Sequence, residues 1–343
     1  MKQKFNLIVI LLTVLTLSLY AKGEENSRKF SKSWPVGSVE TLRINNKFGE
    51  VKINNGGGNS VTVEVVVTAE GSANQINKIL DEIAVEFGSE GSTATAETHI
   101  EEGKRSGSKF SVDYTVNIPP QKNLDITNKF GNVVVSQLTG KGKFDIAFGN
   151  LTAAGLHGPE TRLEVAYGKA DIQSMSKAVV NLAFSKMVLV SGTDIDLDSK
   201  NSSVNADKLN ELQLDSKFDS FDFGEINSMG GSSKFTNYKI EKLNKRLNLQ
   251  SAYGTVKVES IPAGFENLEV NSSYAQISLG IDETAGYEVN ARCDFCDIDY
   301  PKDKFKGNRM QENTSQQVQG KVSSGIPGKV VVTSKYGNIR LTK

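Results

Sequence analysis

Hydrophobic and polar residues alternate along most of the chain. The alternation is clear at residues 124–127 (LDIT) and 268–271 (LEVN), where every second side chain is apolar. A period of two residues is that of a β-strand with one buried face. The segment NQINKILDEI instead has the period of a helix, with apolar side chains at Ile76, Ile79, Leu80 and Ile83. The pattern therefore predicts an all-β protein with one short helix.

A short pattern recurs: an aromatic residue, then usually glycine, then an alternating strand. Twelve copies occur, among them KFGNVVV at Lys129, AYGTVKV at Ala252 and KYGNIRL at Lys335. From the second to the ninth copy the spacing is 17 to 19 residues. Aromatic residues make up only 8% of the chain, yet eleven copies have one at this position and the twelfth has Asn201. The eleven are Phe48, Phe130, Phe148, Tyr167, Phe184, Phe218, Phe235, Tyr253, Tyr274, Phe295 and Tyr336.

Each copy has room for two short strands and two corners, but not for a helix. Such a unit cannot bury its apolar face alone, whereas stacked copies can. We therefore predict a parallel β-solenoid, or β-helix, whose coils of about 17–21 residues lie ~4.8 Å apart. The pattern leaves the handedness open. An antiparallel sandwich built of hairpins is the competing architecture.

The parity of the alternation places each aromatic residue on the same side as the buried residues before it. The aromatic residues should therefore form a buried, stacked ladder inside the solenoid. In six copies a glycine follows the aromatic residue, which indicates a bend in the chain. A second ladder should consist of small polar residues two positions earlier, including Ser216, Ser233, Ser251, Ser272 and Ser334.

Two segments interrupt the repeat. Residues 54–120 contain alternating runs around the helical segment, which predicts a strand–helix–strand excursion that caps the N-terminal end. Residues 301–328 are polar and rich in Gln, Asn and Ser, so we expect a long surface loop there. The predicted organisation is a signal peptide at 1–21, a first coil with the capping excursion at 22–120, and solenoid repeats at 121–343 that include the loop excursion at 301–328.

The N-terminus has the three parts of a secretory signal peptide. Lys2 and Lys4 precede an apolar run from Leu7 to Leu19, and cleavage is expected near Ala21. The run is shorter than the ~20 residues that span a bilayer, so we expect no transmembrane segment after cleavage. The mature protein should be exported, to the periplasm, the outer surface or the medium.

Composition narrows the function. The 40 basic residues balance 40 acidic ones, which argues against nucleic-acid binding because that requires a basic face. With two His and two Cys, the chain offers little material for metal or nucleophile chemistry. We predict no catalytic, cofactor-binding or metal-binding residues, and no cofactor. His99 and His157 have no identifiable nucleophile partner, and no GxSxG or HExxH motif occurs.

Three polar features leave alternatives open. Cys293 and Cys296 flank Phe295, and they form either a local disulfide or two packed thiols. The alternating acids Asp194, Asp196 and Asp198 form either a solvated outer face or a calcium site. The lysines before three consecutive repeat positions should form a short basic row that balances neighbouring charge or contacts a polyanion or glycan: Lys200, Lys217 and Lys234.

The motifs FGNV at Phe130 and YGNI at Tyr336 resemble those of the bacterial putative adhesin family, an exported β-strand-repeat domain of unknown function. The resemblance covers roughly residues 35–343, and Asn201 departs from the motif. It implies adhesion and supplies no catalytic residues. We therefore expect an exported, non-enzymatic, adhesin-like β-solenoid that binds or scaffolds at the bacterial cell envelope or surface.

Two other functions remain open at this point: a carbohydrate-active β-helix enzyme, such as a polysaccharide lyase or hydrolase, and a purely structural envelope protein. The expected partner is a cell-surface glycan or a protein ligand. The sequence does not indicate the ligand's identity, the side of the outer membrane or the oligomeric state.

Overall fold

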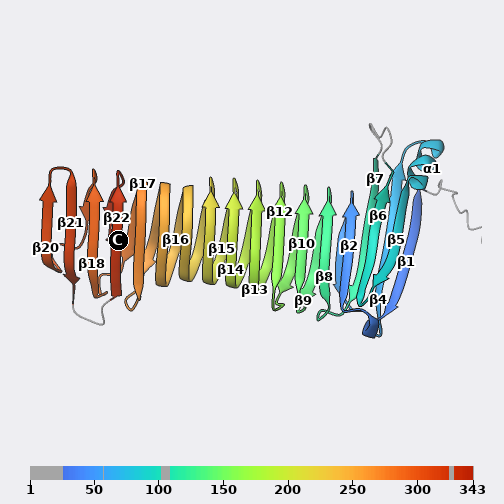
Figure 1. The fold of residues 1–343 in the computed structure, drawn as a ribbon, viewed down its shortest axis with the longest axis horizontal. Coiled ribbons are helices and arrows are strands. Elements are labelled where there is room, and N and C mark those ends of the chain that lie inside the picture. The colour runs from blue at the N-terminus through green and yellow to red at the C-terminus, as the bar shows by residue number, and fades with distance from the viewer. Residues whose placement is uncertain (1–25, 57, 102–108, 324–327, 343) are drawn as a thin grey trace, which may run out of the picture.

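The computed structural model describes residues 26–56, 58–101, 109–323 and 328–342. Nearly all of its regular structure consists of β-strands, in which polar and apolar residues alternate. The strands lie side by side in one long row and belong to a single mixed β-sheet (Figure 1). Within the described ranges, one α-helix and one short 3₁₀ helix complete the regular structure. The chain is therefore all-β, as predicted. The predicted signal peptide at 1–21 lies outside the described residues.

Chain order and spatial order agree in the middle of the row and differ at both ends. The N-terminal elements are β1 (Ser27–Pro35), the 3₁₀ helix Val36–Ser38, β2 (Thr41–Lys47), β3 (Val51–Asn55), β4 (Ser60–Glu70), α1 (Ala73–Asp81), β5 (Ile83–Glu90), β6 (Thr93–Ile100) and β7 (Lys109–Ile118). The central strands are β8 (Asn123–Lys129), β9 (Val133–Leu138), β10 (Gly142–Ala147), β11 (Asn150–Leu156), β12 (Thr161–Ala166), β13 (Lys169–Ala183), β14 (Lys186–Lys200), β15 (Ser203–Lys217), β16 (Ser220–Ile261) and β17 (Asn267–Ile281). The C-terminal strands are β18 (Tyr287–Asp294), β19 (Ile298–Asp299), β20 (Phe305–Glu312), β21 (Ser315–Val322), β22 (Gly328–Lys335) and β23 (Ile339–Arg340).

Each central copy of the repeat contributes two strand segments, one before and one after its aromatic position. The segments before it pair in parallel, as β8 does with β10 and β10 with β12. The segments after it form a second set of parallel pairs, such as β9 with β11. We call these two sets the first row and the second row. Lys186 pairs with Ser203, and Ser203 with Ser220, so equivalent positions of successive repeats lie next to one another.

The inward side chains of both rows fill one continuous hydrophobic core. Leu212 and Leu214 of the first row, and Val204 and Ala206 of the second, are all buried. Along β15 nearly every second side chain is buried, which is the alternation seen in the sequence. Burying one Val, Leu or Ile side chain stabilises the fold by ~1.5–3 kcal/mol. Neighbouring repeats therefore stabilise one another, although no single repeat encloses a core of its own.

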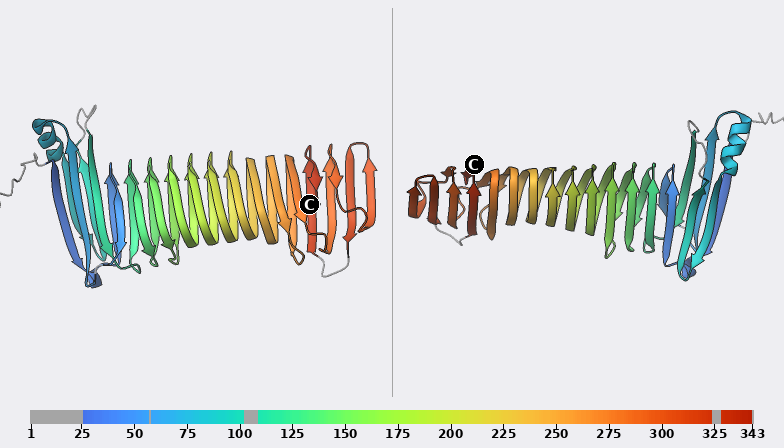
Figure 2. Two further views of the ribbon diagram at one scale, coloured as in Figure 1. Left: turned by 180° about the vertical axis from the view of Figure 1, so that it is seen from behind. Right: turned by 45° about the horizontal axis from the view of Figure 1, so that its top comes forward.

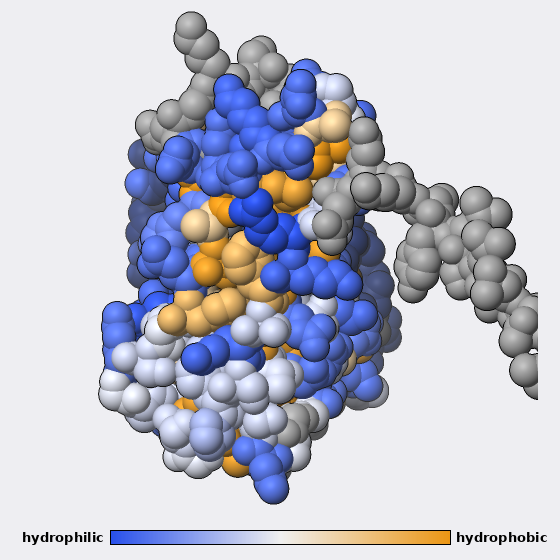
Figure 3. Space-filling model, turned by 90° about the vertical axis from the view of Figure 1, so that its right-hand side faces the viewer, coloured by the Kyte–Doolittle hydropathy of each residue, from blue (hydrophilic) through white to orange (hydrophobic). Residues whose placement is uncertain are grey.

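The N-terminal end contains the predicted strand–helix–strand segment, formed by β4, α1 and β5. The helix begins at a capping box in which Ser72 and Gln75 bond to each other's backbone. It buries Ile76, Ile79 and Leu80, but it ends before Ile83, which begins β5. Antiparallel pairs join β1 to β4, β4 to β7 and β5 to β6. The view onto this end shows a band of apolar surface between hydrophilic margins (Figure 3).

The C-terminal end differs from the prediction. The expected loop at 301–328 contains the strands β20 and β21, which form an antiparallel hairpin. The hairpin adds to the edge of β18, again in antiparallel orientation. The hairpin lies at the end of the row, where few of its side chains contact the core. Its residues are therefore mostly polar, which is the composition that led to the prediction of a loop. The sheet is therefore mixed: the central repeats pair in parallel, as predicted for the solenoid, and antiparallel pairs occur at both ends.

The last repeat does not lie last in space. Strand β22 pairs in parallel with β17 on one side and with β18 on the other. Likewise, β23 lies between β17 and β19. The C-terminal repeat is thus inserted between two repeats that precede it in the sequence, as the strand order in Figures 1 and 2 shows.

The prediction that the aromatic residues are buried is wrong. Their exposed fractions range from 37% to 53%, and their side chains leave the corner toward solvent. All have φ between 51° and 63°, the left-handed region, so the strand parity does not continue through them. The corrected residues are Phe48, Phe130, Phe148, Tyr167, Phe184, Phe218, Phe235, Tyr253, Tyr274, Phe295 and Tyr336.

Small polar side chains occupy the inward position at the same corner. Asn128 is fully buried, and its amide donates to the carbonyl oxygens of Gly49 and Asn132, at 3.0 and 3.1 Å. In later repeats Ser216, Ser233 and the other serines named above are buried in this column. Some of these side chains satisfy corner carbonyl groups, as Asn128 does, and others bond to side chains, as Ser233 does to Ser251 at 3.2 Å. The space that a buried ring would need is therefore already filled.

Candidate functional site

The aromatic side chains form an exposed ladder along one corner of the molecule. Centroids of neighbouring rings lie 4.7–5.1 Å apart, and the planes of stacked rings differ by 2–14°. The spacing follows from the ~4.8 Å separation of adjacent strands. Asn201 interrupts the ladder between Phe184 and Phe218. Each stacked face is covered by the next ring, so the ladder presents mainly ring edges to solvent.

A buried carboxylate lies beneath the middle of the ladder. Asp219 accepts hydrogen bonds from the hydroxyls of Ser199 and Ser216, at 2.8 and 2.7 Å. It also accepts from the backbone N–H groups of Ser202 and Lys217, at 2.7 and 3.0 Å. Four donors satisfy this buried charge. Asp219 is therefore a structural group of the corner and is not part of the exposed acidic surface.

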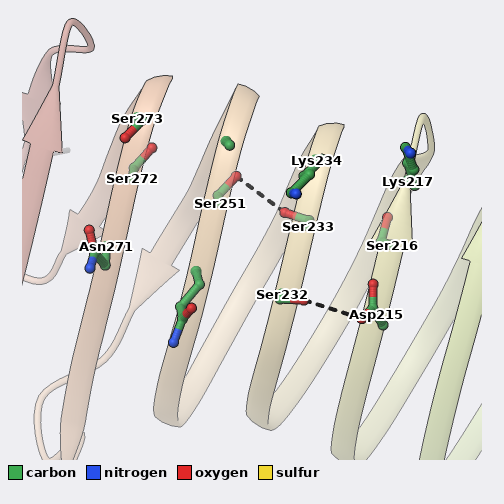
Figure 4. A pocket seen from close by; sticks show the side chains of 12 residues that line it. Asp215, Ser216, Lys217, Ser232, Ser233, Lys234, Ser251, Asn271, Ser272 and Ser273 are labelled. Atoms are coloured by element: carbon green, nitrogen blue, oxygen red, sulfur yellow. Dashed lines mark hydrogen bonds between the residues drawn. The ribbon is translucent and has the colours of Figure 1, made fainter.

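The outer surface of the first row contains a shallow groove over residues 228–234 of β16. Two adjoining depressions of about 520 and 600 Å³ form it. The floor is low because Gly230 and Ser232 occupy positions where Gln213 and Asp215 stand on the neighbouring strand. Figure 4 shows the first depression, with Lys234 at one end.

Backbone geometry requires one of the glycines in this floor. Gly231 has φ of +137°, and a Cβ there would lie 1.9 Å from the carbonyl oxygen of Leu214. A Cβ on Gly230 would lie 2.7 Å from Oε1 of Gln213, whose side chain covers it. Gly230 therefore adds no side chain of its own to the floor, and the side chain of Gln213 lies over it.

Hydrogen-bonding groups of every kind line the groove. Amides come from Gln213, Asn248, Gln250 and Asn271, hydroxyls from Ser232 and Ser273, a carboxylate from Asp215, and ammonium groups from Lys217 and Lys234. At the rim, Arg246 pairs with Glu211 at 3.3 Å and with Glu266 at 3.6 Å. Ser232 donates weakly to Asp215 at 3.4 Å. Such a surface can donate to and accept from a ligand rich in hydroxyl groups.

The structure brings together some of the polar residues that the sequence singled out. Lys200, Lys217 and Lys234 pair in register and form a row beside the ladder. Asp194, Asp196 and Asp198 are exposed on β14 next to this groove, and Asp198 lies opposite Asp215. Among the described residues, no three His, Cys, Asp or Glu side chains are arranged to hold a metal ion.

The two histidines lie away from the groove. His99 is at the N-terminal end, with Nε2 3.4 Å from Glu86. His157 lies between two serines: Nε2 is 3.0 Å from Ser174 Oγ and Nδ1 is 3.2 Å from Ser176 Oγ. Both serine contacts are exposed, and both ring nitrogens are engaged by hydroxyls instead of an orienting carboxylate. This arrangement lacks the third group that aligns a catalytic base.

The two cysteines are joined by a disulfide in the structure. Their Cα atoms lie 5.5 Å apart on either side of Phe295, at the outermost rung of the ladder. Cys293 is buried in the column of small polar residues, and Cys296 occupies the corner position that glycine holds elsewhere. The bond thus spans a single corner.

Sequence reasoning missed the groove. Its floor is the segment SMGGSS at residues 228–233, and its walls come from the repeats before and after. The available signal was the run of small residues at outward positions of a single repeat. In the part of the chain that the structure describes, no helix is long and apolar enough to cross a membrane.

No protein-family model and no curated protein matches this chain. Similar solved structures include a putative cell adhesion protein from Clostridium sporogenes (10% identity, 92% of this chain and 98% of that one, TM-score 0.22). A putative adhesin from Parabacteroides distasonis has 11% identity over 91% of this chain and 96% of that one, with a TM-score of 0.34. A putative lipid binding protein from the same species has 10% identity over 91% and 96%, with a TM-score of 0.30. Likeness at these identities and TM-scores assigns no function to this chain.

Proposed function

We propose that this protein is an exported, non-enzymatic, adhesin-like β-solenoid that binds a glycan at the bacterial cell envelope or surface. In this proposal residues 1–21 are a signal peptide, residues 22–120 hold the first repeat and a cap, and residues 121–343 are the repeat scaffold. The parallel registers between successive repeats support the solenoid, and the apolar run from Leu7 to Leu19 supports export.

The groove over residues 228–234 is the observation that carries the proposal. It is long, shallow and open, so it suits an extended chain better than an enclosed small molecule. Amide, hydroxyl, carboxylate and ammonium groups alternate across it, which matches the donors and acceptors of sugar hydroxyls. The cores of protein–protein interfaces are instead enriched in aromatic residues and depleted in Lys, Asp and Ser. The composition of the groove therefore favours a glycan over a protein ligand.

Binding to a glycan array by residues 22–343 tests the proposal, followed by calorimetry on the glycans retained. Ser232→Tyr should fill the groove floor and weaken binding at least tenfold, because the ring would occupy the space of the ligand. Gln250→Ala should weaken binding by about threefold to tenfold, since a single hydrogen bond contributes ~0.5–1.5 kcal/mol. Thr152→Tyr is the matched control, because Thr152 is exposed on the second row, far from the groove.

The control variant should bind like the unmodified protein, and all variants should retain the β-sheet circular dichroism spectrum. Retention of full affinity by Ser232→Tyr would refute the groove as the binding site. Cleavage of a retained glycan would overturn the non-enzymatic proposal in favour of a carbohydrate-active enzyme. The absence of any glycan ligand would leave the scaffold without its proposed function and refute that proposal as well.

A further inference from the structure

The exposed aromatic ladder lacks one rung. Rings occupy every repeat from Phe48 to Phe184, and again from Phe218 onward, while Asn201 stands between them. Asn201 has φ of 51°, and its N–H bonds to the carbonyl of Lys217 as the equivalent groups of the ladder do. Its backbone therefore has the same conformation as a rung. The ladder continues geometrically through this position, but the side chain there is smaller than a ring.

A shallow recess lies over this position. It is broad, reaching from Gly168 to Phe235, and it includes Phe184, Asn201 and Phe218 together with Lys186, Ser203 and Asn237 toward the second row. Phe184 stacks on Tyr167, and Phe218 on Phe235, so each of them turns its other face toward Asn201. Two aromatic faces thus form opposite walls of one slot.

The width of the slot matches a single flat ring. Phe184 and Phe218 are two repeats apart, which places them ~10 Å apart at the strand spacing of a sheet. A planar ring midway between them would have a neighbour at about 5 Å on each side, which is the preferred range for offset stacking. This is the spacing of 4.9–5.0 Å that the ladder has on both sides of the gap. A pyranose ring in its chair form is thicker than an aromatic ring and fits this spacing less well.

The slot is already partly filled by its own residue. Phe184 and Phe218 are 50% and 47% exposed, which is no more than Phe148, a ring stacked on both faces. Both walls are therefore covered about as much as a stacked ring is, by the Asn201 side chain and, at 5.6 Å from the Phe218 ring centroid, by the Lys217 ammonium group. A ring that enters must displace this amide toward the rim, where Ser203 and Asn237 offer hydrogen-bonding groups.

We propose that this slot binds one planar aromatic ring, which completes the ladder as its missing rung. The ring belongs either to a tyrosine or phenylalanine side chain of a peptide or to a free aromatic molecule, because both present the same flat face. Lys186, Asn237 and the hydroxyls at the rim suit a polar ring substituent or flanking peptide groups. This site is separate from the groove over residues 228–234 and does not depend on glycan binding.

Saturation-transfer NMR on residues 22–343, with 4-methylphenol as the probe, tests the slot. Asn201→Tyr supplies the missing rung from within and should reduce binding at least tenfold. Asn201→Gly retains the left-handed backbone and removes the competing amide, so it should strengthen binding about threefold or more. Phe148→Gly opens an equivalent slot between Phe130 and Tyr167 and should add a second site for the probe.

The arms of the experiment separate the possible ligands. An N-acetylated tyrosine-containing tripeptide that binds more tightly than 4-methylphenol would assign the slot to a protein side chain, and the reverse order would assign it to a free aromatic molecule. Methyl glucoside that binds and is lost in Asn201→Tyr would overturn the assignment to an aromatic ring. Equal 4-methylphenol binding by the unmodified protein, Asn201→Tyr and Asn201→Gly, or no binding by any of them, would overturn the proposal. Circular dichroism and the urea midpoint of each variant verify that it is folded.

Discussion

Replacing Phe148 by alanine should cost about 2 kcal/mol of unfolding free energy, less than a buried ring would. Phe148 stacks between Phe130 and Tyr167 at 4.9 Å on both sides, yet 51% of it is exposed. A fully buried aromatic side chain covers ~150–250 Å², so about 100 Å² is covered here. At ~25 cal/mol per Å² this area corresponds to about 2.5 kcal/mol, of which alanine retains a small part. A fully buried phenylalanine would cost ~3–5 kcal/mol on truncation.

The left-handed backbone makes a second substitution informative. Phe148 has φ of 56°, and this conformation costs a residue with a Cβ ~1–2 kcal/mol. Asparagine tolerates it better than alanine and already occupies the same position at residue 201. Phe148→Asn should therefore cost only about 1 kcal/mol, even though it removes the ring and adds a polar group. At a buried position the order would be reversed, because asparagine would need hydrogen-bond partners that alanine does not.

Equilibrium urea unfolding, followed by circular dichroism, measures both changes. Leu151→Ala is the matched control, because Leu151 is fully buried in the same repeat and should lose ~2–5 kcal/mol. The slopes of the urea transitions should agree among the variants. A changed slope would show that the repeat array no longer unfolds as one cooperative unit. A loss above 3 kcal/mol for Phe148→Ala, or a larger loss for asparagine than for alanine, would refute the exposed, left-handed ladder.

Three further measurements follow from the structure. Asp219→Ala should cost about 3 kcal/mol because it removes the acceptor of four hydrogen bonds, three of them buried. Asp219→Ser places here the residue that the two preceding repeats have at this position, and it should cost about half as much in urea unfolding. Gly131→Ala should cost ~1–3 kcal/mol, since the new Cβ would lie 1.9 Å from the carbonyl oxygen of Gly49, and a neutral result would mean that the corners are looser than described. Burial raises the pKa of Tyr114 from 10.0 to about 12, and burial also raises the pKa values of Tyr238 and Tyr287. The unfolded chain therefore loses these phenol protons at a lower pH than the folded protein does, so the unfolding free energy should fall as the pH rises from 10 to 12. A urea midpoint that is flat across that range would contradict the burial of these phenols.

The repeat could be predicted because its physical cause is local. Alternation at residues 124–127 fixes which side chains face the core, and the constant spacing of the aromatic positions implies that equivalent residues lie side by side. The direction of the rings could not be predicted by the same argument, because parity holds only while the backbone stays extended. Asn201 could have indicated a left-handed backbone at the aromatic position, since asparagine is among the residues that best tolerate that region.

The groove and the hairpin escaped prediction for different reasons. The groove depends on a difference in side-chain size between neighbouring repeats. Gly230 and Ser232 form its floor only because the larger side chains of Gln213 and Gln250 stand on either side. The hairpin of β20 and β21 lacks a clear alternation because it adds to an edge of the sheet and buries little. Amide-rich segments of this kind have the composition of a loop. Their strand structure comes from pairing with β18, which is a long-range contact.

The insertion of the last repeat between β17 and β18 determines the order in which this end of the molecule can be completed. As the chain is made from its N-terminus, β18 is complete before β22 is present to separate it from β17. Until the final residues emerge, β18 has no correct neighbour on its inner side, and the edge of β17 stays open. The C-terminal strand β22 therefore joins β17 to β18, and a chain shortened before residue 328 would lose the pairing that connects this end to the rest of the sheet. Folding of this end of the sheet is thus complete only when β22 and β23 have taken their places.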